Sequence, residues 1–162
     1  MLLKEFDKIS TDEQTVILTA PVNVAILAAI ADDGEVDKRE KASAIKLAHL
    51  RTFTSPEPLR DLYRAIDADF EINFDQTVHD IPAEMTVEEK MEFVRERLKP
   101  LPGILQKIDR RLGEMFVESL ESFAHHVFKT HSNFLSVTLL PTIRLDFKNE
   151  ILDETDDEVS ED

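Results

Sequence analysis

Cysteine is absent from the chain, and so is tryptophan. Without a thiol the protein can form no disulfide bond, no zinc–thiolate site and no cysteine nucleophile. This absence fits a reducing compartment, and we expect a cytoplasmic protein. Glycine is scarce as well, with 3 residues among 162, so the backbone offers few places for a phosphate-cradling loop. Several familiar kinds of active site are therefore excluded by composition.

Basic residues are also few in comparison with acidic ones. The chain has 19 lysines and arginines against 34 aspartates and glutamates, which gives a formal net charge of −15. Nucleic acids and anionic membrane surfaces repel a chain of this charge. The charge therefore argues against nucleic acid as a ligand and favours cations or a basic protein partner.

One apolar run is long enough to raise the question of a membrane span. It extends from Val16 to Ala31, but Thr19, Pro21 and Asn23 interrupt it. A membrane-spanning helix needs about 20 predominantly apolar residues, so we expect no span here. Proline has no backbone N–H to donate, and Pro21 therefore predicts a break between a short helix and a second, buried helix.

Helical signals extend over most of the chain, because apolar residues recur at three- and four-residue spacings. Four capping signals mark helix starts: Ser10 with Glu13, Asp37 with Glu40, Ser55 with Pro56, and Thr86 with Glu89. The longest predicted helix covers residues 101–129. The sequence thus predicts an all-α, compact single-domain globule of six or seven helices, formed by residues 1–152, without a sheet.

The C-terminal end of the chain is strongly acidic. Residues 134–140 are apolar, residues 142–152 have the spacing of a final helix, and residues 153–162 contain seven acids and no base. We expect residues 153–162 to be a disordered, solvated tail, since they have little apolar surface to bury. Two roles stay open for this tail, a solubilising end and an electrostatic hook for a basic protein.

The most informative stretch runs from Ala31 to Glu40 and has the sequence ADDGEVDKRE. Gly34 follows the apolar run directly and is well placed to leave a helix with a positive φ. Asp37 is a good N-cap for the next helix, and Glu40 completes the spacing of a capping box. As a capped helix junction, the stretch needs no ligand.

The same residues also have part of the spacing of a calcium-binding loop. With Gly34 as the sixth position of D-x-[DN]-x-[DN]-G-x₅-E, Asp33 is the fifth, Asp37 the ninth and Glu40 the twelfth. Alanine occupies the first and third positions, so two of the usual ligands are missing. The sequence predicts at most a weak metal site of Asp33, Asp37 and Glu40. Because these ligands are all oxygens, the metal would be calcium or magnesium rather than zinc.

The run from Thr19 to Glu40 resembles the tellurite-resistance TerB-like domains. In that family an apolar helix ends in an Ala-Asp-Gly turn, which is followed by a branched aliphatic residue and a glutamate. Asp33, Gly34, Val36 and Glu40 occupy those motif positions. The resemblance implies a compact, non-catalytic helical domain whose acidic residues bind divalent metal, with a link to stress responses. It is confined to the first third of the chain.

Other candidate sites are incomplete. Glu121 and His125 are four residues apart, whereas di-iron bundles use Glu-x-x-His on paired helices. The nearest second-half counterpart of the acidic turn, Thr130 to Phe134, has no carboxylate and no glycine. We find no nucleophile paired with a base, and we expect no enzyme. Two functions remain: a TerB-like cation-binding or sensing module, and an acidic protein-interaction adaptor that uses no metal.

Overall fold

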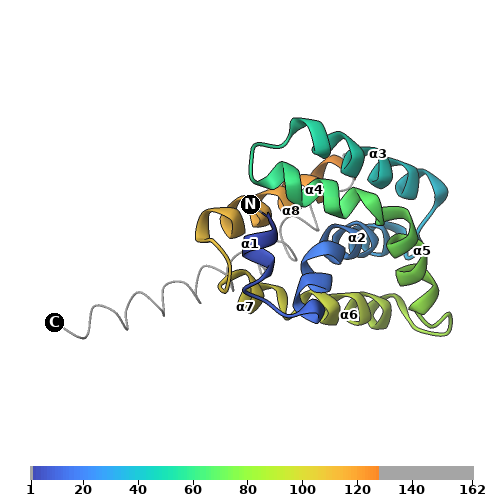
Figure 1. Ribbon diagram of the computed structural model, residues 1–162. Coiled ribbons are helices and arrows are strands. Elements are labelled where there is room, and N and C mark those ends of the chain that lie inside the picture. The colour runs from blue at the N-terminus through green and yellow to red at the C-terminus, as the bar shows by residue number, and fades with distance from the viewer. Residues whose placement is uncertain (1, 128–162) are drawn as a thin grey trace.

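The computed structural model describes the backbone of residues 2–127 and the side chains of residues 4–125. The described residues form eight helices and no strand. In chain order these are α1 (Leu2–Phe6), α2 (Thr11–Asp33), α3 (Lys38–Thr54), α4 (Leu59–Ala68), α5 (Phe70–Asp80), α6 (Val87–Leu98), α7 (Leu101–Leu105) and α8 (Arg110–Val127) (Figure 1). Because α1 and α7 have only five residues each, six longer helices build the globule. The predicted all-α class is confirmed.

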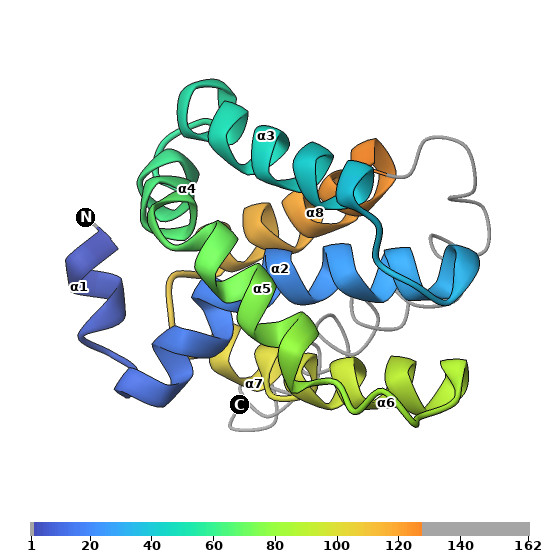
Figure 2. The same ribbon diagram turned by 90° about the vertical axis from the view of Figure 1, so that its right-hand side faces the viewer.

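The longest of these helices, α2, lies at the centre of the domain. Every residue from Ala20 to Ile30 is buried, and α2 contacts each helix from α3 to α8 (Figure 2). A helix that is apolar on all sides requires such a position. By length and composition α2 would also be able to cross a membrane, but 67% of its most apolar window is buried inside the protein. A core helix meets the same criterion, so the criterion alone assigns no membrane span.

Pro21 does not divide the apolar run, and that prediction was wrong. The residue is buried inside α2, and the helix continues from Thr11 to Asp33. Proline removes one backbone hydrogen bond at a local cost. The residues on both sides of it are buried in the core, and this burial outweighs the local cost.

Local signals mark the starts of three of the eight described helices. The pairs Ser10 with Glu13, Asp37 with Glu40, and Thr86 with Glu89 all form complete capping boxes, as predicted. The signal at Ser55 was wrong, because Ser55 is the C-cap of α3 and α4 begins only at Leu59. A residue that precedes a proline disfavours the helical conformation, and Glu57 precedes Pro58. The second proline therefore delays the helix start.

The predicted helix over residues 101–129 is in fact divided into α7 and α8. The connection between them ends at Asp109, whose Oδ1 accepts a hydrogen bond from the Leu112 N–H at 3.0 Å. The backbone N–H of Asp109 donates to Glu5 Oε2 at 2.7 Å, so α1 contacts this junction. The break is therefore held by a residue more than a hundred positions away. The apolar residues that recur along this range at three- and four-residue spacings are nevertheless buried in the core: Leu105, Ile108, Leu112, Phe116, Leu120 and Phe123.

Several predictions lie outside the described residues. They concern the apolar stretch 134–140, the final helix 142–152, the acidic tail 153–162, and Thr130 to Phe134 as a second motif.

Candidate metal centre

Gly34 makes the turn between α2 and α3. Its φ of 81° and ψ of −5° are left-handed, and its N–H donates to the Ile30 carbonyl at 2.8 Å, which closes the end of α2. Asp33 supports the turn, since its Oδ1 accepts a hydrogen bond from the Glu35 N–H at 3.2 Å. The predicted positive φ is confirmed, and glycine is the residue that adopts it without strain.

Asp37 and Glu40 hold the start of α3. Asp37 Oδ1 accepts a hydrogen bond from the Glu40 N–H at 2.7 Å, and Glu40 Oε2 accepts one from the Asp37 N–H at 3.0 Å. This reciprocal pair is the predicted capping box. One oxygen of each carboxylate is therefore engaged in helix capping, and the position of the Glu40 side chain is determined by the helix start.

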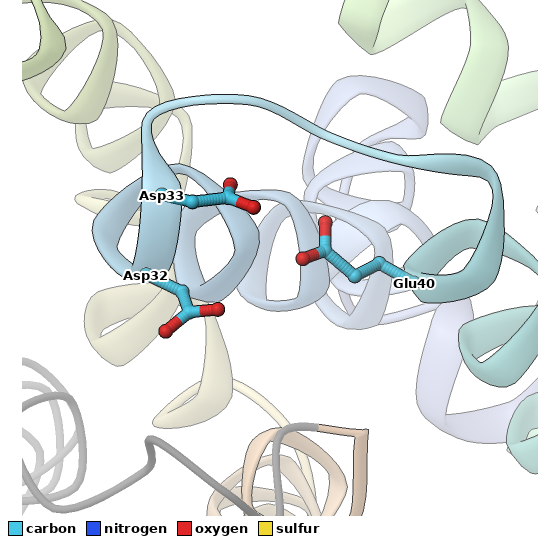
Figure 3. Close-up of side chains that lie close together, drawn as sticks. All are labelled: Asp32, Asp33 and Glu40. Atoms are coloured by element: carbon cyan, nitrogen blue, oxygen red, sulfur yellow. The ribbon is translucent and has the colours of Figure 1, made fainter.

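Three carboxylates come together across this turn. Asp32 and Asp33 from the end of α2 and Glu40 from the first turn of α3 each offer an oxygen, and these oxygens lie within 4.8 Å of one another. Figure 3 shows the Asp33 and Glu40 carboxylates pointing towards each other across the turn. The described part of the chain contains one group of three or more His, Asp or Glu side chains that are close enough to share a metal ion, and these three carboxylates form it.

The assembled group differs from the predicted ligand set by one residue. Asp33 and Glu40 are in both sets. Asp37 lies outside the group, and its carboxylate caps α3 instead. Asp32 was not predicted as a ligand, although its position beside Asp33 on the last turn of α2 was a usable signal. Whether Asp32 or Asp37 lies close to Asp33 and Glu40 depends on how α2 packs against α3. The spacing of residues in the sequence does not determine that packing.

The electrostatics of the group centre on Glu40. Partial burial raises the pKa of the Glu40 carboxyl, and the nearby charges of Asp37, Asp33 and Asp32 raise it further. The hydrogen bond from the Asp37 N–H acts in the opposite direction and lowers it. The net direction is upward, so the folded protein holds this carboxylate in an environment that disfavours its negative charge. Asp32 and Asp33 are both exposed, which leaves the group open to water.

A hard cation fits this donor set. The three ligands are carboxylate oxygens, and the open side of the group allows a bound ion to keep water molecules. The histidine hypothesis finds no comparable support, since His125 is exposed on α8 and belongs to no such group among the described side chains.

Comparison with known proteins adds no further information. We found no match among protein-family models, curated proteins or solved structures. The resemblance to TerB-like domains therefore rests on the residues of the acidic turn alone.

Proposed function

We propose that the Gly34 turn is a weak binding site for a divalent cation in a non-catalytic helical domain. The observation that supports this most directly is the convergence of Asp32, Asp33 and Glu40 to within 4.8 Å. Burial is the main cause of the raised pKa of Glu40, and the negative charges of Asp33 and Asp32 raise it further, so the three carboxylates repel one another. A bound cation removes this repulsion, and the relief contributes to the binding free energy. By resemblance to TerB-like domains, the role is cation binding or sensing in a stress response.

Calcium and magnesium suit the site better than zinc does, because no nitrogen or sulfur ligand is present in the group. Calcium takes six to eight oxygens, and three carboxylates leave several positions to water. Such a site binds weakly, with a dissociation constant on the order of 1 mM, like the weakest extracellular calcium modules.

The first test measures thermal and urea unfolding with calcium, with magnesium and with a chelator at matched ionic strength. Calcium at ten times its dissociation constant is expected to raise the free energy of unfolding by about 1.4 kcal/mol. The double variant Asp33→Asn with Glu40→Gln should lose this gain. Both replacements keep an oxygen in place, so the hydrogen bonds from the Glu35 and Asp37 N–H groups can persist. The loss then reports charge at the site rather than a broken turn.

A matched control separates site binding from general screening of a chain with a charge of −15. Glu57→Gln with Glu84→Gln removes the same two charges at exposed positions outside the group. This control should keep the full calcium gain. Equal gains in all three proteins would contradict the metal site. They would favour the second function, an acidic adaptor for a basic protein, for which the acidity of the chain is the supporting observation.

The pH dependence of stability provides a further prediction. In the presence of chelator, Glu40 has a higher pKa folded than unfolded, so the folded state binds more protons between those two values. Through this group the free energy of unfolding therefore falls as the pH rises from the unfolded pKa through the folded one. At a pH below the pKa of Glu40 in the unfolded state, Glu40 is protonated in both states and does not lower the free energy of unfolding.

The measurement is the difference in unfolding free energy between the wild type and Glu40→Gln, taken in urea from about pH 4 to pH 7. With chelator, the wild type should lose stability relative to the variant as the pH rises. With calcium the trend should be reversed, because the cation binds the ionised carboxylate. A flat difference in both conditions would show that burial and the nearby carboxylates do not raise the pKa of Glu40 in the folded protein.

A further inference from the structure

The outward side of α3 carries no carboxylate, although the chain contains 34 acids. The exposed residues of this helix are basic, small and neutral, or apolar. Its one acid, Glu40, is half-buried and is engaged in the helix cap. We refer to Lys38, Arg39, Lys46, Leu50 and Phe53 together as the α3 stripe. Arg39, Lys46, Leu50 and Phe53 follow one another at intervals of seven, four and three residues, which places them on one helix face.

The cations of the α3 stripe form no ion pair within the described part of the protein. The side chains of Lys38, Arg39 and Lys46 are exposed and form no hydrogen bond or ion pair with any other described residue. Lys41, on another side of the same helix, behaves differently: its Nζ lies 3.4 Å and 2.8 Å from two carboxylates of α5. Lys41 therefore forms ion pairs within the protein, whereas the three cations of the α3 stripe can form ion pairs with another segment or molecule.

The second half of the stripe is apolar. Leu50 is 51% exposed and Phe53 is 68% exposed, and the Phe53 ring has an edge contact with the His49 ring. In both views α3 runs along the top of the molecule, and in Figure 2 the end of α8 lies beside its first turns (Figures 1 and 2). The stripe is thus a surface with positive charge at its N-terminal end and apolar side chains at its C-terminal end.

The chain contains a segment with the complementary order. Residues 146–162 include nine acids and one lysine, and the apolar Phe147, Ile151 and Leu152 precede the most acidic part, residues 153–162. We propose that the α3 stripe is a docking surface for residues 146–162 of the same chain. With this segment running in the direction opposite to α3, its apolar residues meet Leu50 and Phe53, and its acids meet the three cations.

The connection is long enough for this contact within one molecule. α8 packs against α3, since Arg51 donates hydrogen bonds to Ser119 and Ser122. Residues 128–145 join the end of α8 to the segment and can span up to about 60 Å, whereas α3 is about 25 Å long. A tethered segment also has an effective concentration in the millimolar range, so weak contacts suffice. An anionic membrane is the less suitable occupant, because the whole chain carries −15.

The absence of cysteine allows a direct test in the full-length chain, because one introduced cysteine is the only labelling site. A nitroxide at Val159→Cys should broaden the amide signals of residues 38–46 in ¹⁵N-labelled protein, with more than half of their intensity lost. A nitroxide at Asn149→Cys should act instead on residues 50–53. Signals of α6 and α7 should keep their intensity. Chelator is present throughout, so the outcome does not depend on the cation site.

The variant Lys38→Glu, Arg39→Glu, Lys46→Glu should restore the α3 signals, as should salt at about 1 M, where the Debye length is about 3 Å. The control Lys4→Glu, Lys90→Glu, Arg111→Glu makes the same change in net charge elsewhere and should leave the broadening unchanged. Circular dichroism verifies that both variants are folded.

Three results would overturn the proposal. The first is undiminished α3 signals in the wild type at low salt. The second is equal restoration by the stripe variant and the control, which would indicate unspecific charge attraction. The third is broadening that occurs only between a spin-labelled copy and a separate ¹⁵N-labelled copy, which would assign the contact to self-association. Stripe-dependent sedimentation with phosphatidylserine vesicles, together with undiminished α3 signals, would assign the surface to lipid instead.

Discussion

Replacing Gly34 by valine is expected to lower the free energy of unfolding by about 2–5 kcal/mol. A residue with a Cβ loses about 1–2 kcal/mol in the left-handed conformation, and Gly34 has a φ of 81°. The added side chain also meets a neighbour, because a Cβ at this position would lie 3.0 Å from Val87 Cγ2 on α6. Overpacking of this kind typically costs a further 1–3 kcal/mol. Urea unfolding followed by circular dichroism measures the loss.

Two further variants divide this loss into its causes. Gly34→Ala in a Val87→Ala background has no such close contact, so its loss of unfolding free energy relative to Val87→Ala alone is the cost of the backbone conformation. Gly34→Asn should be the mildest single replacement, since asparagine tolerates the left-handed region better than other residues. Asp33→Asn should change stability by only a few tenths of a kcal/mol, as an exposed acid near a helix end does. A larger loss for Asp33→Asn than for Gly34→Val would show that the turn is not held by its backbone geometry.

Ser119→Ala is expected to lower the free energy of unfolding by about 1–3 kcal/mol, because it leaves a buried hydroxyl without its partner. Tyr63 is fully buried, and its hydroxyl forms a hydrogen bond with Ser119 Oγ. Arg51 donates to the same oxygen at 3.0 Å and lies with its guanidinium carbon 5.8 Å from the centre of the Tyr63 ring. Burial raises the pKa of the Tyr63 hydroxyl, while Ser119 and Arg51 act to lower it. These contacts join α3, α4 and α8.

A double-mutant cycle with Tyr63→Phe tests this interpretation. Removal of both the tyrosine hydroxyl and the serine hydroxyl should cost less than the sum of the two single losses, because no unpaired Tyr63 oxygen remains in the core. Strict additivity would show that the two hydroxyls are not coupled. Ser122→Ala is the matched control: it removes the other acceptor of Arg51 but leaves the Tyr63 hydrogen bond in place. Its loss should be smaller than that of Ser119→Ala.

Short-range features of this protein were determined by the sequence itself. A capping box depends on residues three apart, and the boxes at Ser10, Asp37 and Thr86 all form as predicted. The positive φ of Gly34 follows from the need to close α2 at a residue without a side chain. The all-α class follows from apolar spacing that only helices can place on one buried side. In each case the interacting atoms lie within about one helical turn.

Features that depend on distant residues were decided only by the tertiary structure. Pro21 remains within α2 because six other helices pack around this helix and bury the residues next to the proline. Helix propensity, which depends on the local sequence, does not include this packing. The division between α7 and α8 is held in part by Glu5, which is 104 positions from Asp109. In the same way, Asp32 rather than Asp37 joins Asp33 and Glu40, because the packing of α2 against α3 determines which oxygens converge. Sequence spacing restricts which residues can meet, and the free energy of packing the whole core selects among them.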